Sequence, residues 1–214
     1  MPAAGLARRL QPLDSSKEML PVGGRPVMDY LFERMEAIPC AEIRVVTRPE
    51  KRDVVEHSRA RGALVLEARP ESVGESLRAG ASGLDGGRVA VFGFPDTLWE
   101  PVDGLASLVL RLGGDVDAVL GIFRAAEAAR SDVVEFDGER VLTIEVKPER
   151  PRSDLVWGCA ALRIRTLRTL GAEPGRVLDR LARGGRVAGV RLEDPFLDIG
   201  TPEALARYGF SAGA

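Results

Sequence analysis

Apolar and polar residues alternate along the chain with two different periods, and these periods predict helices and strands in turn. Over residues 25–38, apolar side chains fall every three or four positions, which is typical of a helix with one buried face. A β-branched run at residues 43–47 follows and predicts a strand. The alternation continues, with helices expected at residues 50–60, 74–82 and 103–112 and strands at residues 63–66, 89–92 and 116–123. This β-α-β-α order predicts a mostly parallel sheet with helices on both faces.

The pattern changes in the second half of the chain. Asp137-Gly138 separates two β-branched runs and is a typical hairpin turn. Strands are expected at residues 133–136, 141–146, 156–164 and 187–192, with a helix at residues 166–183. No low-complexity tract or linker divides residues 1–214, which are therefore predicted to form one domain. A hairpin joined to a parallel sheet gives a mixed α/β sheet, and such sheets bind ligands at the carboxyl ends of their strands.

Composition narrows the class of protein. The 214 residues weigh 23.0 kDa, and 45% are hydrophobic, which is enough to form a folded core. The formal net charge of -2 lacks the basic excess of a general nucleic-acid binder, and no apolar run is long enough for a transmembrane helix. Two isolated cysteines, Cys40 and Cys159, suit a reducing cytoplasm, and a single histidine leaves little room for a histidine-based zinc site.

Lysine is rare in this sequence. Of the 30 basic residues, only three are lysines: Lys17, Lys51 and Lys147. Because arginine replaces lysine almost everywhere else, a retained lysine is a candidate for a site that needs a compact point charge. Lys51 and the single histidine, His57, fall on the helix expected at residues 50–60, where both are expected to be surface residues.

The N-terminal segment is rich in small residues, with Ala3, Ala4 and Gly5 a few positions before Arg9. Small side chains let a backbone approach a ligand closely, and the amide groups of such a loop can bind phosphate oxygens. The guanidinium of Arg9 can pair with phosphate through its planar fork. Taken alone, the segment is more typical of a plain surface loop than of a phosphate site.

Several segments, read in order, carry a family resemblance. P-A-A-G-L at residues 2–6, K-E-M-L-P-V at 17–22 and R-P-V at 25–27 resemble the sugar nucleotidyltransferase family, the nucleoside diphosphate sugar pyrophosphorylases. K-E-M-L-P-V is most similar to the glucose-1-phosphate uridylyltransferase branch, with the glucose-1-phosphate thymidylyltransferase branch as near neighbour. Later segments resemble further motifs of the family in the same order: Arg69-Pro70 with Gly74, Phe94-Pro95-Asp96, Glu145-Val146-Lys147-Pro148 and Phe196-Leu197-Asp198-Ile199-Gly200-Thr201-Pro202.

The resemblance implies a Rossmann-like, three-layer α/β/α fold of the nucleotide-diphospho-sugar transferase type, with a mixed, mostly parallel sheet. In that family an apolar strand precedes P-A-A-G, whereas here Met1 directly precedes Pro2. The first strand is therefore expected to be missing or truncated. The resemblance also implies a cytoplasmic enzyme that binds a nucleoside triphosphate and a sugar 1-phosphate, with no nucleic acid or membrane partner. A homo-oligomer is left open.

The family transfers a nucleotidyl group to a sugar 1-phosphate and releases pyrophosphate. The resemblance implies that Asp96 and Asp198 are the ligands of Mg²⁺, whose charge helps two anions to approach each other. It implies two catalytic residues, with Arg9 binding the departing pyrophosphate and Lys17 stabilising charge at the reacting phosphates. UTP or dTTP is favoured as the nucleotide by K-E-M-L-P-V.

The remaining matched positions imply binding roles. The nucleotide-binding residues implied are Ala3, Ala4, Gly5, Arg69 and Gly74. The sugar-phosphate-binding residues implied are Glu145, Lys147 and Gly158. Trp157 lies next to the last of these in the sequence and is expected near the sugar pocket.

Several positions depart from the family pattern. Ala7 replaces a glycine, which costs energy if the residue needs a positive φ. Arg8 replaces a small hydroxyl residue, and Arg69 stands where a base-reading glutamine is expected. Val146 is inserted within the Glu-Lys-Pro segment. These departures keep open a second interpretation, a non-catalytic relative that binds nucleotide or sugar phosphate as a sensor or partner module.

Overall fold

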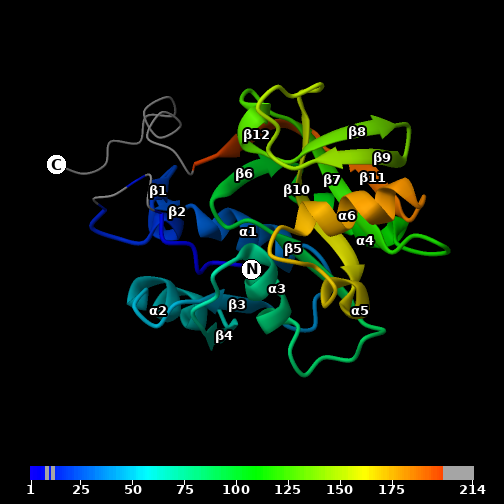
Figure 1. Cartoon of the computed structure of the whole chain (residues 1–214). Helices are drawn as coiled ribbons and strands as arrows, with labels where there is room; N and C mark the ends of the chain where they lie inside the picture. The colour runs from blue at the N-terminus through cyan, green and yellow to red at the C-terminus, as the bar shows by residue number, and fades with distance from the viewer. Residues whose placement is uncertain (8–9, 11–12, 200–214) are drawn as a thin grey trace.

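The structure, a computed structural model, describes residues 1–7, 10 and 13–199 (Figure 1). In the first part of the chain, β3 (Arg44–Thr47) pairs in parallel with β4 (Leu64–Glu67), and α2 (Arg52–Ala60) connects the two strands. This β-α-β unit is the one that the hydrophobic pattern predicts, and it lies at the lower left of Figure 1.

A six-stranded mixed sheet forms the centre of the molecule. In spatial order its strands are β5 (Val89–Gly93), β10 (Leu155–Arg163), β7 (Ala118–Arg124), β11 (Val187–Arg191), β9 (Arg140–Glu145) and β8 (Val133–Asp137). β10 is antiparallel to β5 and β7, and β11 is parallel to β7, so β5, β7 and β11 run in one direction. The mixed α/β sheet is thus confirmed, and so is the β8–β9 hairpin. Fewer strand pairs are parallel than the pattern suggests, because β10 lies between β5 and β7.

The remaining helices are α1 (Met28–Glu36), α3 (Val73–Gly80), α4 (Gly104–Arg111), α5 (Ile164–Leu167) and α6 (Pro174–Arg183), with 3₁₀ turns η1 (Lys17–Met19) and η2 (Ala128–Arg130). Two expected boundaries are wrong. The first helix begins later than residue 25, since β1 (Pro21–Val22) and β2 (Arg25–Pro26) form a small hairpin there. The helix expected at 166–183 is split, because Pro174 starts a new helix at a position that needs no N–H donor. In the described part of the chain, no helix is long and apolar enough to cross a membrane.

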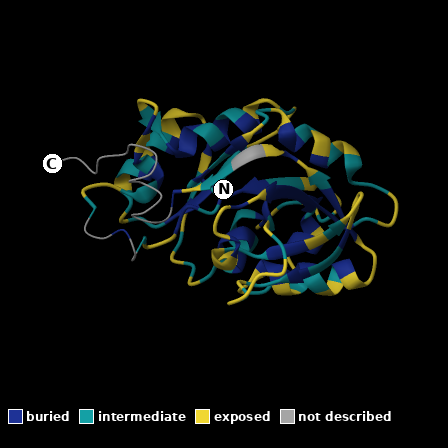
Figure 2. Cartoon of the chain, turned by 90° about the horizontal axis from the view of Figure 1, so that it is seen from above, coloured by how far each residue is buried: buried dark blue, intermediate teal, exposed yellow. Residues whose placement is uncertain are grey.

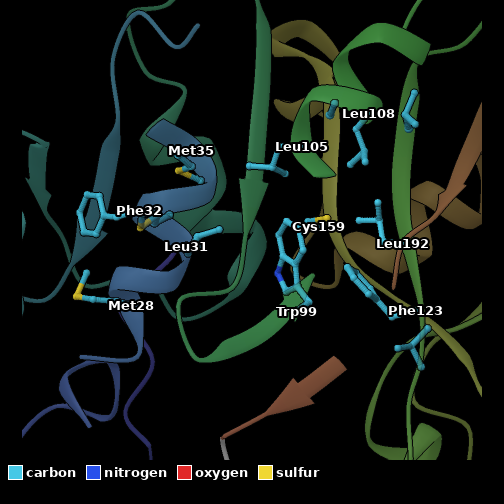
Figure 3. Close-up of a cluster of buried hydrophobic side chains, with 14 of the residues drawn as sticks. Met28, Leu31, Phe32, Met35, Trp99, Leu105, Leu108, Phe123, Cys159 and Leu192 are labelled. Atoms are coloured by element: carbon cyan, nitrogen blue, oxygen red, sulfur yellow. The ribbon is translucent and has the colours of Figure 1, made fainter. Parts of the chain in front are cut away.

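Successive residues of β7 point to opposite faces of the sheet, and each face has its own core. Val119 and Phe123 join the buried cluster that also contains residues of α1 and α4, part of which is drawn in Figure 3. Leu120 and Ile122 join the cluster on the other face, with residues of α3, α5 and α6. Figure 2 shows the buried strands inside and the partly exposed helices outside. The predicted three-layer α/β/α arrangement is therefore confirmed.

A short antiparallel pair, β6 (Thr97–Glu100) with β12 (Glu193–Asp198), lies beside the main sheet. The hydrophobic pattern does not predict it, because β6 is only four residues long and the register shifts within β12. The pair places Asp198 opposite Thr97, and the N–H of Ile199 donates to the carbonyl of Asp96 at 2.9 Å. Two aspartates about 100 positions apart in the sequence are thereby brought together.

Residues 1–3 begin a parallel ladder beside β3. The Met1 amino group donates to the carbonyl of Arg44 at 2.7 Å, and the N–H of Val46 donates to the carbonyl of Met1 at 3.0 Å. The N–H of Ala3 then donates to the carbonyl of Val46 at 2.8 Å. The ladder contains one isolated bridge among the described residues, between Pro2 and Val46.

An apolar hollow of about 540 Å³, here called the slot, lies between β3 and β5. In the described part of the chain, β5 is an edge strand of the central sheet, and β3 bonds to residues 1–3 on the side away from β4. Val46 lines the slot from β3, and Val89 and Val91 line it from β5. Met1 and Gly80, the last residue of α3, also line it.

Candidate active site

A cleft of about 780 Å³ opens at one end of the central sheet. Three of its charged residues stand at the ends of strands: Asp96 beyond β5, Lys147 beyond β9 and Asp198 at the end of β12. Trp157 joins them from near the start of β10, which runs in the direction opposite to β5. Residues at strand ends converge on one edge of an α/β sheet, which is where such folds bind ligands.

Lys17 and Asp96 form the central ion pair of the cleft. The Lys17 ammonium donates directly to the Asp96 carboxylate, and the side chains are 19% and 15% exposed. Burial works against both charges, but the attraction between them is stronger. The pKa of Asp96 is therefore lowered by Lys17, and the pKa of Lys17 is raised by Asp96 and Glu18. The pair stays ionised over the whole neutral range.

The second aspartate lies close to this pair. The charge of Asp198 also raises the pKa of Lys17, and the backbone next to Asp198 bonds to the carbonyl of Asp96. The two carboxylates are hard oxygen donors, which Mg²⁺ prefers. Among the residues that the structure describes, no group of three or more His, Cys, Asp or Glu side chains could hold a metal. Asp96 and Asp198 are thus two described carboxylates of the cleft that could hold a Mg²⁺ ion.

The loop at residues 4–7 forms the wall beside Lys17. Ala4 and Gly5 line the cleft, and a side-chain carbon on Gly5 would lie 3.6 Å from the Lys17 Nζ. Ala7 has a φ of +50°, in the region where a side chain costs energy. The missing glycine that the sequence indicates at this position is therefore a real source of strain. Strain of this kind concentrates at binding sites.

Ala3 lies beneath the cleft wall and is fully buried. Its carbonyl accepts hydrogen bonds from the Thr47 hydroxyl at 3.2 Å and from Lys51 Nζ at 2.9 Å. The carbonyl of Ala4 accepts one from the guanidinium of Arg48 at 2.9 Å. Of the three small residues implied to bind nucleotide, Ala4 and Gly5 thus face the cleft, while Ala3 anchors the loop.

Lys147 lies in the opposite wall of the cleft, with a φ of +43°. Asp132 faces the same space, and burial raises the pKa of its carboxyl although the charge of Lys147 opposes this. The inserted Val146 lines the cleft as well, whereas Glu145 lies 3.5 Å from the guanidinium of Arg152. The insertion therefore leaves Lys147 at the cleft and places Glu145 outside its lining.

Three further predicted residues are not part of the cleft lining. Arg69 is 62% exposed and pairs with Glu50. Gly74 passes so close to the carbonyl of Gly171 that a side-chain carbon would lie 1.7 Å from its oxygen. A side-chain carbon on Gly158 would lie 2.4 Å from the ring of Phe196, so this glycine makes room for β12. The catalytic prediction for Arg9 lies outside the described residues.

Comparison with known proteins agrees with this geometry. The profile of the MobA-like NTP transferase domain matches residues 2–132, which is more than half of the chain. The chain belongs to the MobA-like NTP transferase family. The resemblance to sugar nucleotidyltransferases is confirmed with it.

Similar proteins of this NTP transferase family carry related names. A glucose-1-phosphate thymidylyltransferase from Actinoplanes sp. is 32% identical over 165 residues, which cover 71% of this chain and 52% of that protein. A protein of the same name from Neisseria gonorrhoeae is 25% identical over 170 residues, which cover 75% of this chain and 58% of that protein. The chain thus spans about half the length of these relatives.

Solved structures show the same fold as this transferase domain. A UDP-glucose pyrophosphorylase complexed with UDP-glucose superposes with a TM-score of 0.81 at 18% identity, covering 97% of this chain and 94% of that chain. A UDP-glucose pyrophosphorylase from Acinetobacter baumanii superposes with a TM-score of 0.79 at 17% identity, covering 97% and 90%. At this level of identity the likeness supports the fold alone.

Sequence reasoning missed two cations of the transferase domain. Arg48 lines the cleft and donates to the carbonyls of Ala4 and Pro70. Its place directly after β3 is the signal that could have identified it.

The expectation that Lys51 is a solvated surface charge is wrong: its side chain is 12% exposed and pairs with Glu18, which is fully buried. Burial lowers the pKa of Lys51 and raises the pKa of Glu18, and the attraction between the two charges opposes both shifts.

Proposed function

We propose that this chain transfers a nucleotidyl group from a nucleoside triphosphate, UTP or dTTP, to a sugar 1-phosphate, and releases pyrophosphate. The observation that carries the proposal is the grouping of Lys17 with Asp96 and Asp198 on one side of the cleft, opposite Lys147. Transfer between two anions needs cations at both phosphates and carboxylates for a metal, and this cleft has both.

The residues divide the chemistry between the two walls. A phosphate oxygen of the sugar phosphate attacks the α-phosphorus, and the bond from that phosphorus to the bridging oxygen of pyrophosphate breaks. Lys17 stabilises the negative charge at the reacting phosphates, and the N–H groups of the loop at residues 4–7 hold the triphosphate. Lys147 holds the incoming sugar phosphate and orients it for in-line attack. Arg9 is proposed to receive the departing pyrophosphate.

Magnesium is the proposed cofactor. Bound by Asp96 and Asp198, it neutralises charge on the triphosphate that would otherwise repel the sugar phosphate. Within the described residues, Lys17 is the side chain that pairs with Asp96, and its release from Asp96 frees the ammonium for phosphate. Arg48, which borders the loop at residues 4–7, adds positive charge to the same wall.

The nucleotide base is the least supported part of the proposal. The support is the K-E-M-L-P-V segment and the printed names of the relatives, which include thymidylyltransferases and UDP-glucose pyrophosphorylases. Arg69, at the position implied to read the base, faces Glu50 instead. A cytoplasmic location is proposed as well, because Cys40 and Cys159 are both unpaired thiols.

The test is pyrophosphate release from UTP, dTTP, CTP, ATP and GTP, each with several sugar 1-phosphates, with and without Mg²⁺. We expect metal-dependent release with one preferred pair, strongest for UTP or dTTP. Release that prefers a purine nucleotide would refute the base assignment, and release that ignores Mg²⁺ would refute the metal assignment.

The strain at Ala7 favours a second function. This residue has a φ of +50°, which favours glycine, yet it is an alanine. The second function is that of a non-catalytic relative that binds nucleotide or sugar phosphate as a sensor or partner module. Nucleotide binding by the folded protein without turnover of any pair would favour this second function over transfer.

A further inference from the structure

Lys51 connects two segments that are distant in sequence but adjacent in the cleft wall. Its Nζ donates to both oxygens of Glu18, at 2.8 and 2.7 Å, and to the carbonyl of Ala3 at 2.9 Å. Glu18 belongs to η1, directly after Lys17, and Ala3 precedes the loop at residues 4–7. The side chain of Lys51 is thus a buried link between the loop and the turn that carries Lys17.

The link uses the full bonding capacity of the ammonium. A lysine has three N–H donors, and all three are matched to acceptors here. The loop also borders the Lys17 ammonium, since a side-chain carbon built on Gly5 would lie 3.6 Å from the Lys17 Nζ. A fixed ammonium beneath both segments therefore sets the distance between the triphosphate-binding loop and Lys17.

Burial makes this link costly, which argues against an incidental contact. Two charges removed from water lose several kcal/mol of hydration, and apolar residues would often stabilise a fold equally well. The same helix has an ordinary ion pair for comparison, Arg59 with Glu67, whose side chains are 59% and 37% exposed. Lys51 with Glu18 differs from it in burial and in the added bond to a loop carbonyl.

We propose that Lys51 is a positioning residue for the nucleoside triphosphate: through Ala3 and Glu18 it holds the phosphate-binding loop in register with Lys17. The proposal rests on the proposed function, because it names the triphosphate as the ligand of that loop. It concerns nucleotide binding and not the sugar phosphate, whose proposed contact, Lys147, lies in the opposite wall.

The test compares Lys51→Met with wild type in titrations of UTP and dTTP, followed by intrinsic fluorescence and by steady-state kinetics. We expect KM and Kd for the nucleotide to rise by about tenfold or more, as for other residues that orient a ligand-binding group. KM for the sugar 1-phosphate should stay within about twofold. Lys51→Arg keeps the charge and several donors, so it should recover a large part of the nucleotide affinity.

A second variant separates positioning from folding. Lys51→Met leaves a buried, unpaired carboxylate, so the variant is expected to lose thermal stability. Adding Glu18→Gln removes that charge and should restore much of the stability, but it cannot restore the bond to the Ala3 carbonyl. If nucleotide affinity returns together with Tm in the double variant, Lys51 is merely structural and the proposal is overturned.

The exposed pair provides the matched control. Arg59→Met should leave both KM values and the nucleotide Kd unchanged. If Lys51→Met weakens nucleotide binding in a protein that shows no turnover, positioning holds while the transfer function fails. If Lys51→Met binds nucleotide like wild type, the positioning role fails whatever the turnover. Wild-type protein that binds neither nucleotide would overturn both.

Discussion

The cleft and the slot are two hollows whose linings differ in the charge of their side chains. The cleft, about 780 Å³, is lined by charged groups such as Lys17, Asp96 and Lys147. The slot, about 540 Å³, is lined mainly by apolar side chains and by the edges of β3 and β5. In the cleft, side chains pair across segments that the fold brings together. In the slot, β3 bonds to residues 1–3, whereas the outer edge of β5 faces the slot without a partner strand in the described part of the chain, so apolar contacts dominate there.

The difference shows where paired polar side chains are concentrated in this fold, namely in the cleft. Charges in the cleft are held by partners from distant segments, as in the Lys17–Asp96 pair, and can therefore survive partial burial. In the slot, the Met1 amino group bonds to a backbone carbonyl and has no charged partner of this kind among the described residues, and burial lowers its pKa to about 5. We therefore expect substitutions in the cleft to change mainly catalytic activity, and changes in the slot to alter mainly the free energy of unfolding.

The largest effect is expected at the cleft. Asp96→Asn removes a carboxylate proposed to bind Mg²⁺ and leaves Lys17 without its charged partner, so kcat for pyrophosphate release should fall by about 10³-fold. The free energy of unfolding should change much less than the activation free energy of the reaction. Asp115→Asn, on an exposed turn outside the cleft lining, is the matched control and should keep wild-type kcat. An equal loss in both variants would contradict the assignment.

The next effect belongs to the slot and appears as a pH dependence. Burial lowers the pKa of the Met1 ammonium from 8.0 to about 5. Between these values the unfolded chain binds more protons than the folded chain, so stability rises from pH 5 to pH 8. A shift of this size corresponds to about 4 kcal/mol in the free energy of unfolding.

Urea unfolding at pH 5, 6, 7 and 8 measures this dependence. Carboxylates also titrate near pH 5, so the comparison is with protein acetylated at its N-terminus. Acetylation removes the titrating amine while keeping one N–H donor toward the Arg44 carbonyl. We expect the acetylated protein to have the flatter profile. Identical profiles would show that the Met1 amine is not buried in solution.

Helix α3 has a glycine near each end, and the same substitution should change the free energy of unfolding in opposite directions at the two positions. Gly74→Ala would place a carbon 1.7 Å from the Gly171 carbonyl, and we expect it to cost about 3 kcal/mol in the free energy of unfolding. Gly80→Ala places its carbon 3.4 Å from Val46, in the slot, and should stabilise by about 0.5 kcal/mol through helix propensity. Thermal denaturation of both variants measures the contrast, and equal signs would show that the slot is tightly packed.

The smallest effect concerns strain in the loop of the cleft. Ala7→Gly should stabilise the fold by about 0.5–1 kcal/mol, because glycine adopts a φ of +50° without a steric cost. Ala4→Gly, in the same loop but without a positive φ, should destabilise by a similar amount. Denaturant unfolding of the two variants provides the measurement. A loss of stability in both would mean that Ala7 is not strained in solution.

Much of the fold could be predicted from hydrophobic periodicity, since a strand such as β7 alternates between two buried faces. Family motifs also single out Lys17, Asp96, Lys147 and Asp198, and the topology gathers these residues in one cleft. Periodicity failed for β6 and β12, because both are short or irregular and packing decides their pairing.

The direction in which each side chain of the site points could not be predicted from the sequence. Lys51 caps α2 with a backbone conformation outside the helix, so helix periodicity says nothing about where its ammonium points. Arg69 matches a motif position, yet its side chain turns to Glu50. Gly74 and Gly158 are required by close packing of backbone and ring, and a sequence does not distinguish such a glycine from one that approaches a ligand.

The scarcity of lysine has a practical consequence for labelling chemistry. The sequence has three lysines and one α-amino group, so amine-reactive reagents have four targets. Two lysines line the cleft, the third links its wall from below, and the Met1 amine borders the slot. Exposed Lys147 should acylate first, and Lys17 and Lys51 more slowly. A mass spectrum of partially acylated protein therefore reads the accessibility of both hollows at once, with almost no background from the rest of the surface.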